Sequence, residues 1–179
     1  MDEEPQRLPV RAFIGLGSNI GDRCATLRSA RAALDELPGT TTIAFSPMIE
    51  TEAVVRPGAP PQAPYLNAAA QLETSLGPRA LLDALLDIER DRGRDRADAE
   101  RWTPRTLDLD LLLYGEQIIN EPGLTVPHPH MHEREFVLAP LASIAPDALH
   151  PVLKRTVGEM LESVRSRSGA SMPESGSPG

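Results

Sequence analysis

The sequence contains few of the residues on which several classes of protein depend. Cys24 is its single cysteine, which excludes an internal disulfide and a cluster of thiolate metal ligands. Its net charge of −8 argues against general nucleic-acid binding, which requires excess positive charge along the phosphate backbone. No run approaches the roughly eighteen apolar residues of a membrane-spanning helix, and the start of the chain, with acidic residues at 2–4, differs from a secretory signal. We therefore expect a cytoplasmic protein without nucleic-acid or membrane partners. We also expect it to be a monomer.

The length of 179 residues is typical of one domain. Residues 1–9 are polar and contain proline, and they are interpreted as a flexible arm. Residues 10–165 are expected to form a single domain. Residues 166–179 are mostly Ser, Gly, Pro and Glu, which provide too little apolar surface to bury, so we expect a disordered tail.

The most informative stretch is 101–110, which combines two arginines and the only tryptophan with an alternating apolar run. In a strand, alternate residues point to the same face, and the buried face would carry Leu107, Leu109, Leu111 and Leu113. Asp108 and Asp110 would then share the other face, with about 6.6 Å between their Cα atoms. Carboxylates at that spacing can converge on two cations about 3.5–4 Å apart. The alternative is a solvated strand face, although aspartate is disfavoured in strands.

Periodicity along the chain indicates the order strand, helix, strand, strand, helix, strand. The expected ranges are 10–17, 25–37, 42–52, 68–74, 78–93 and 107–114, with a short partner strand at 117–120. Pro47 limits the second strand to an edge or a bulge. This order predicts an α+β, ferredoxin-like βαββαβ fold, an antiparallel sheet with helices packed on it and extra C-terminal helices. Residues 53–64 contain four prolines and are expected to form a long loop.

The glycines after the first strand suggest a phosphate-binding loop, but no Gly-Lys-Ser/Thr sequence follows them. Gly15 and Gly17 are better interpreted as positions where the backbone turns tightly or approaches a ligand closely. Paired aspartates beside a cluster of arginines instead match phosphoryl transfer, in which magnesium and fixed positive groups stabilise the phosphate charge. Arg94, Arg96 and Arg105 are the candidates for that fixed charge.

For the other candidate site residues, a purely structural role is an alternative to ligand binding. His128, held between two prolines, could donate to a phosphate oxygen, whereas a zinc site with the neighbouring histidines is disfavoured because Pro129 interrupts regular structure. Tyr65 and Phe136 could stack on a flat ring whose edge Asn67 recognises, although Phe136 alone is equally consistent with core packing. Trp102 is interpreted as an anchor in a charged loop, and Glu89 as one member of a surface ion pair.

The stretch 101–110 closely resembles the signature of the 6-hydroxymethyl-7,8-dihydropterin pyrophosphokinase family of folate biosynthesis. The segments 15–19, 65–69 and 124–128 support the resemblance, in the family's order and approximate spacing. The resemblance covers roughly residues 12 to 160. It implies a ferredoxin-like domain that moves pyrophosphate from ATP to the pterin hydroxymethyl group, giving AMP and the pterin diphosphate.

Carried over residue by residue, the resemblance implies three sets of site residues. Arg94, Arg105, Asp108 and Asp110 would be catalytic, with Asp108 and Asp110 holding two Mg²⁺ ions around ATP. Glu89, Arg96, Trp102, Leu111 and His128 would bind ATP. Thr51, Tyr65, Asn67 and Phe136 would bind the pterin.

The sequence departs from the family pattern in two places. Pro129 follows His128 where some relatives have tyrosine, which puts one nucleotide contact in question, and the loop 53–64 has its own composition. Other classes also remain open. An RNA-binding module of the same fold would need exposed aromatic and basic residues on its sheet, which this chain lacks. A silent relative would have lost an aspartate or arginine, and another magnesium-dependent nucleotide enzyme is the remaining alternative.

Overall fold

The computed structural model describes residues 7–53, 55–92 and 106–170. The main sheet contains β1 (Val10–Ser18), β2 (Thr40–Phe45), β3 (Ile49–Thr51), β4 (Tyr65–Thr74) and β5 (Asp108–Tyr114). The helices are α1 (Arg23–Asp35), α2 (Pro78–Asp91), α3 (Glu135–Ile144) and α4 (Val157–Gly169), with the 3₁₀ turn η1 (Met131–Glu133). Two small hairpins pair β6 (Ile119–Glu121) with β7 (Leu124–Val126), and β8 (Leu149–His150) with β9 (Arg155–Thr156). None of the helices in these described ranges is long and apolar enough to cross a membrane.

The strand order confirms the predicted α+β fold. The main sheet runs β2-β4-β1-β5, with β3 also paired to β4, and every pairing is antiparallel. Central β1 and β4 are therefore flanked by β2 and β5, as the split βαβ arrangement requires. The predicted strand 42–52 is divided, because Ser46 and Pro47 separate β2 from β3. The predicted strand near 117–120 pairs with β7 rather than with β5.

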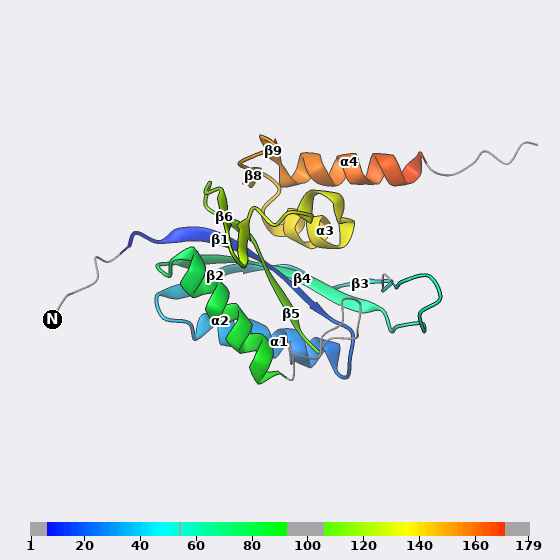
Figure 1. Cartoon of the computed structure of the whole chain (residues 1–179), viewed down its shortest axis with the longest axis horizontal. Coiled ribbons are helices and arrows are strands. Elements are labelled where there is room, and N and C mark those ends of the chain that lie inside the picture. Colours follow the sequence, from blue (N-terminus) through cyan, green and yellow to red (C-terminus); the bar gives the residue numbers. More distant parts are fainter. Residues whose placement is uncertain (1–6, 54, 93–105, 171–179) are drawn as a thin grey trace, which may run out of the picture.

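One face of the sheet is covered by α1 and α2 (Figure 1). Each helix presents an apolar stripe to the sheet at helical spacing, made of Leu27, Ala30 and Leu34 on α1 and Leu81, Leu85 and Ile88 on α2. The side chain of Asp22 caps α1 by accepting from the backbone N–H of Ala25 at 3.0 Å. Pro78 lies in the first turn of α2, where its missing N–H has no cost.

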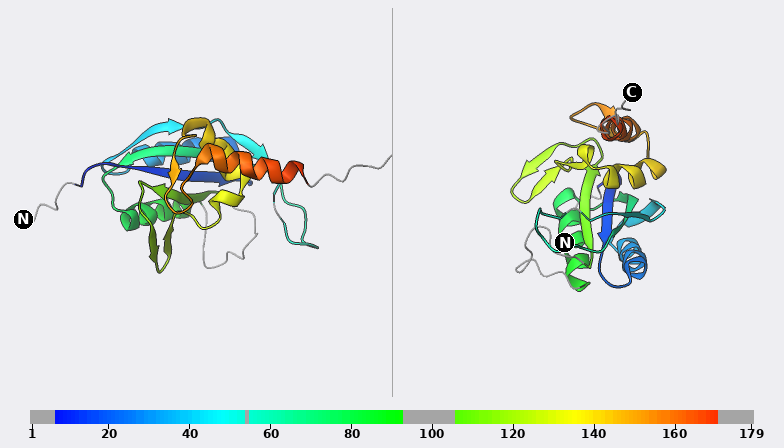
Figure 2. Two further views of the ribbon diagram at one scale, coloured as in Figure 1. Left: turned by 90° about the horizontal axis from the view of Figure 1, so that it is seen from above. Right: turned by 90° about the vertical axis from the view of Figure 1, so that its right-hand side faces the viewer.

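On the other face, α3 lies against the sheet and α4 packs on α3 (Figure 2), and both contribute to a second apolar core with Phe13, Ala69, Leu112 and Leu113. Thr156 and Glu159 form a capping box at the start of α4. This helix continues to Gly169, so the prediction of a disordered tail from residue 166 is wrong for residues 166–169. The reason is the apolar face of the preceding turns, whose Met160, Leu161 and Val164 hold the helix against the core.

A bulge in β5 alters the predicted parity of its leucines. The register with β1 shifts at Phe13/Ile14, so Leu113 pairs with Phe13 while Leu111 pairs with Ile14. Leu111 consequently packs toward α1 and α2, whereas Leu112 and Leu113 pack toward α3 and α4. The prediction that Leu113 shares a face with the three preceding leucines is therefore wrong, because the extra residue reverses the alternation.

Candidate active site

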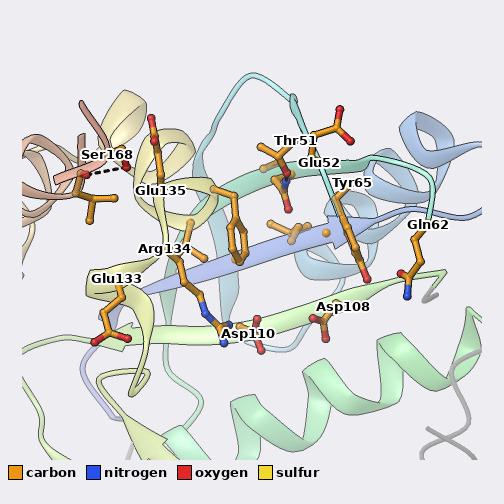
Figure 3. Close-up of a pocket in the computed structure, with 18 residues that line it drawn as sticks. Thr51, Glu52, Gln62, Tyr65, Asp108, Asp110, Glu133, Arg134, Glu135 and Ser168 are labelled. Atoms are coloured by element: carbon orange, nitrogen blue, oxygen red, sulfur yellow. Dashed lines mark hydrogen bonds between the residues drawn. The ribbon is translucent and has the colours of Figure 1, made fainter. Parts of the chain in front are cut away.

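A cavity of about 570 Å³ lies on the α3 side of the sheet, a size typical of small-molecule sites (Figure 3). Its lining includes residues of β1, β4 and β5, the end of β3 and the segment leading into α3. It brings together six of the residues predicted from the sequence: Thr51, Tyr65, Asn67, Asp108, Asp110 and Phe136.

The two aspartates line the cavity from the same side of β5, as their alternation with the leucines predicted (Figure 3). In the ladder with β1, Asp110 lies opposite Gly15 and Asp108 lies opposite Gly17. Paired residues of an antiparallel ladder point to the same face, so a side chain at either glycine would project beside an aspartate. The two glycines therefore leave the carboxylates open to the cavity.

Glu89 differs from its prediction. Its side chain is 1% exposed, and one carboxylate oxygen accepts from the backbone N–H of Leu109 at 2.8 Å. Leu109 lies between the two aspartates on β5, an edge strand of the sheet. Its backbone N–H points away from the sheet and is buried by α2, so it needs an acceptor that no neighbouring strand in the described ranges supplies. The interpretation of Glu89 as a surface ion pair is wrong, because the helix buries it against β5. Glu89 therefore holds the strand segment between the aspartates and does not line the cavity, and its predicted contact with ATP stays a prediction.

The opposite wall is built by β3 and β4. Thr51 and Tyr65 face each other as the last rung of their ladder, and Asn67 donates from Nδ2 to Thr51 Oγ1 at 2.6 Å. Gly17 keeps this wall accessible. A Cβ atom there would lie 3.3 Å from Asn67 Oδ1 and 3.6 Å from Tyr65 Cδ1. Asn67 is 5% exposed, so its amide is fixed in position rather than solvated.

Phe136 joins the cavity from α3, and it also packs partly against the second core. Both sequence interpretations of this residue therefore describe part of its environment. The guanidinium carbon of Arg134 lies 5.8 Å from the centroid of the Phe136 ring. This places a cation beside an aromatic ring at the α3 side of the cavity.

Arg134 is a cavity residue that the sequence reasoning missed. Figure 3 shows its side chain extending from the start of α3 toward Asp110. It therefore brings fixed positive charge to the carboxylate wall. Its position two residues before Phe136 could have indicated this role. The arginines between residues 90 and 105 were instead predicted to supply the positive charge for the phosphates.

His128 lies beside this charged group without lining the cavity itself. Its backbone N–H donates to Leu112 O at 2.9 Å, and its Nδ1 accepts from the N–H of His130 at 3.2 Å. Burial, then the neighbouring Arg134, lowers the pKa of His128 to about 4, although Asp108 acts in the opposite direction. At neutral pH the ring is uncharged with its proton on Nε2, so it can donate one hydrogen bond.

The remaining predicted residues are not gathered here. Leu111 is 5% exposed and belongs to the core beneath α1 and α2. Its predicted contact with ATP stays a prediction. Four further predicted residues lie outside the described ranges: Arg94, Arg96, Trp102 and Arg105.

Comparison with known proteins gives a consistent family. The model of a family described as 7,8-dihydro-6-hydroxymethylpterin-pyrophosphokinase (HPPK) matches residues 13–146. The chain is 47% identical over 125 residues to a Pseudomonas putida 2-amino-4-hydroxy-6-hydroxymethyldihydropteridine pyrophosphokinase, covering 70% of this chain and 99% of that protein. It is 48% identical over 133 residues to the Bacillus subtilis protein of the same name, covering 74% and 77%.

Solved structures show the same fold. A crystal structure of HPPK-DHPS in complex with substrates matches with a TM-score of 0.69 and 13% identity, over 91% of this chain. Wild-type Plasmodium falciparum HPPK-DHPS with pteroate matches with a TM-score of 0.70 and 15% identity, over 96% of this chain. The chain spans 45% of the length of each of these proteins.

Proposed function

The chain belongs to the 7,8-dihydro-6-hydroxymethylpterin-pyrophosphokinase family, and from this premise we propose which of its residues carry out the reaction. The activity is that of a pyrophosphokinase in folate biosynthesis. The pterin hydroxyl oxygen forms a bond to the β-phosphorus of ATP, the bond from that phosphorus to the α,β-bridging oxygen breaks, and AMP leaves. The hydroxyl loses its proton, and the γ-phosphate travels with the transferred group.

Asp108 and Asp110 are the proposed ligands of two magnesium ions that bind with ATP. Their carboxylates face one cavity from one strand, and oxygen ligands of this kind suit magnesium that also binds substrate phosphates. When bound, the ions would neutralise charge on the triphosphate. Glu89 keeps the strand between the two carboxylates in place through Leu109.

The wall opposite the aspartates is the proposed pterin subsite. Tyr65 and Phe136 supply aromatic faces, and Asn67 and Thr51 supply a fixed polar pair for the edge of the pterin ring. The pair is already hydrogen-bonded and largely buried, so little ordering is needed on binding. We call these four residues the pterin wall.

Positive charge for the phosphates is assigned to Arg134 within the described ranges, and to Arg94 and Arg105 from the family resemblance. Arg96 and Trp102 are proposed to contact ATP from the same segment. Phosphoryl transfer depends mainly on positioning and electrostatic stabilisation, so fixed guanidinium groups suffice without a catalytic lysine. We propose that neutral His128 donates one hydrogen bond from Nε2 to a phosphate oxygen.

One observation carries the assignment of residues: a single cavity has paired carboxylates on one wall and the pterin wall on the other. The test is AMP formation from ATP, with and without 6-hydroxymethyl-7,8-dihydropterin and with and without a magnesium chelator. We expect AMP only when both pterin and magnesium are present. Formation of ADP instead would retain phosphate chemistry and contradict pyrophosphoryl transfer, and AMP formation that survives chelation would contradict the metal assignment.

A further inference from the structure

Arg23, the first residue of α1, connects two strands on the far side of the sheet from the cavity. One guanidinium nitrogen, Nη1, donates to the carbonyl oxygen of Pro64 at 2.7 Å. The other, Nη2, donates to Glu50 Oε2 at 2.8 Å. The Arg23 side chain is 28% exposed and that of Glu50 is 58% exposed, so the bond to Pro64 is partly shielded from water whereas the ion pair with Glu50 is exposed. Neither Arg23 nor Glu50 lines the cavity.

The two partners of Arg23 bracket the rung of the pterin wall. Glu50 immediately precedes Thr51 on β3, and Pro64 immediately precedes Tyr65 on β4. Thr51 and Tyr65 are paired directly across the ladder. A planar guanidinium can bind a carboxylate and a carbonyl oxygen at once, which a point charge such as lysine does less well. Arg23 therefore holds both strands at the rung that faces the ligand.

This rung needs such support because its ladder is short. β3 pairs with β4 at only three positions, and the rung is the one next to the loop 52–64. Terminal rungs of short ladders open at low free-energy cost, more so beside a long loop. Asn19 adds a second tie, since its Nδ2 donates to Gln62 Oε1 and to Ala63 O, both at 3.3 Å. Asn19 is 4% exposed.

We propose that Arg23 is a positioning residue for the pterin subsite, acting through Glu50 and Pro64 to hold Thr51 and Tyr65 in the binding geometry. The proposal rests on the function proposed above, because it assigns the pterin to the wall that contains this rung. The nucleotide side is built on β5 and does not depend on these contacts. Loss of Arg23 should therefore weaken pterin binding selectively.

The chain offers a matched control. Arg79 also binds one carboxylate and one proline carbonyl, through contacts from Nη2 to Glu121 Oε2 at 3.3 Å and to Pro122 O at 2.9 Å. None of these three residues lines the cavity. Arg79→Ala thus removes the same kind of interaction at a site that the pterin does not reach.

The kinetic test compares Arg23→Ala, Arg23→Lys, Glu50→Gln and Arg79→Ala. We expect Arg23→Ala to raise the KM for pterin about tenfold, the effect of losing charge-assisted hydrogen bonds worth about 1.4 kcal/mol. The KM for ATP should change less than about twofold. Arg23→Lys should give an intermediate KM because it can keep one partner, and Glu50→Gln a smaller increase because it keeps an oxygen acceptor. Arg79→Ala should match the wild type in both KM values.

Backbone amide hydrogen exchange without ligands provides a second readout that is independent of turnover. Faster exchange across residues 49–51 and 65–67 in Arg23→Ala, and not in Arg79→Ala, is expected. Unchanged exchange there, or equal increases of both KM values, would overturn the positioning role. If the wild type made no pterin-dependent AMP, the proposed function would fail, while the exchange result would still decide whether Arg23 holds the rung.

Discussion

The two walls of the cavity are built differently. The carboxylate wall comes from one continuous strand, in which Asp108 and Asp110 are two residues apart and paired along their length with β1. The pterin wall is assembled from β3, β4 and the start of α3, and two of these are joined by the loop 52–64. The first wall is determined locally and the second by contacts between distant segments.

The supports of the two walls differ in the same way. A buried carboxylate, that of Glu89, holds the backbone of β5 between the aspartates. On the pterin wall the support consists of a hydrogen bond between Asn67 and Thr51 and the contacts of Arg23 behind them. The structure therefore gives the two carboxylates a rigid backbone, while the residues of the pterin wall depend on side-chain contacts for their positions. Changes in the first wall should alter turnover, and changes in the second should alter pterin affinity.

The largest expected effect is on the carboxylate wall. Asp110→Asn should lower turnover by at least about 10³-fold, because it removes the negative charge of a proposed metal ligand. The fold should persist or become slightly more stable, because two like charges no longer share one strand face. AMP formation and the midpoint of thermal unfolding are the two measurements.

Asp83→Asn is the control for this change, since Asp83 is an exposed aspartate on α2 outside the cavity. It should keep wild-type turnover. Equal activity of Asp110→Asn and Asp83→Asn would contradict the assignment of Asp110 as a metal ligand. It would also contradict the expectation that changes in the carboxylate wall alter turnover.

The second effect tests the pterin wall, because Asn67 and Tyr65 are the residues that a Cβ atom at Gly17 would contact. Gly17→Ala would place a methyl group 3.3 Å from Asn67 Oδ1 and 3.6 Å from Tyr65 Cδ1. We expect the KM for pterin to rise about tenfold or more, as a misplaced methyl group in a binding site typically costs 1–3 kcal/mol. Steady-state kinetics with each substrate varied in turn would measure this change.

Gly169→Ala is the matched glycine control, because its added Cβ meets no atom within 4 Å. It should leave both KM values unchanged. A larger rise in the KM for ATP than for pterin in Gly17→Ala would place the nucleotide, rather than the pterin, against Tyr65 and Asn67.

The same contrast explains how far the sequence alone could predict the site. Asp108 and Asp110 could be assigned to one face because strand alternation is a local property. The face of the sheet on which Leu113 lies could not be predicted, because a bulge depends on the register with the partner strand. Glu89 was assigned to the surface because arginines follow it in the sequence, yet its partner is a backbone N–H twenty residues away. Arg134 was missed because only folding brings the start of α3 beside β5.

The overall fold was more predictable than the site. Apolar periodicity and the order of elements suffice for the split βαβ sheet, because each helix must cover the sheet face that its neighbouring strands leave open. The division of 42–52 into two strands was harder to predict from the sequence. Ser46 breaks the ladder there by accepting from Ala69 N–H through its side-chain oxygen at 2.8 Å, which sequence periodicity does not reveal.

A third prediction tests the support of the carboxylate wall. Glu89→Ala would leave the N–H of Leu109 without this acceptor, in a buried position. We expect the free energy of unfolding to fall by about 1–3 kcal/mol, the cost of a buried polar group that has lost its partner. Urea-induced unfolding followed by circular dichroism would measure it. Glu89→Gln keeps a side-chain oxygen and should lose less. Equal stability of Glu89→Ala and the wild type would show that β5 does not need this support.

The smallest effect concerns the protonation of His128 in the free protein. Burial and then Arg134 hold its pKa at about 4, below the ordinary value of 6.5. Between these two values the unfolded chain binds more protons than the folded protein. The contribution of His128 to stability is therefore present above pH 6.5, is lost progressively as pH falls toward 4, and changes no further below that.

NMR titration of the His128 ring without nucleotide or metal would test this assignment. We expect a midpoint near pH 4, so that the ring beside the carboxylate wall stays neutral through the physiological range. Arg134→Met removes one of the two main causes of the lowered pKa. It should raise the midpoint only part of the way toward the ordinary value, because burial is the larger cause. A wild-type midpoint at the ordinary value would mean that His128 is solvated. His128 would then be partly protonated near neutral pH, which would contradict its proposed role as a neutral donor to a phosphate oxygen.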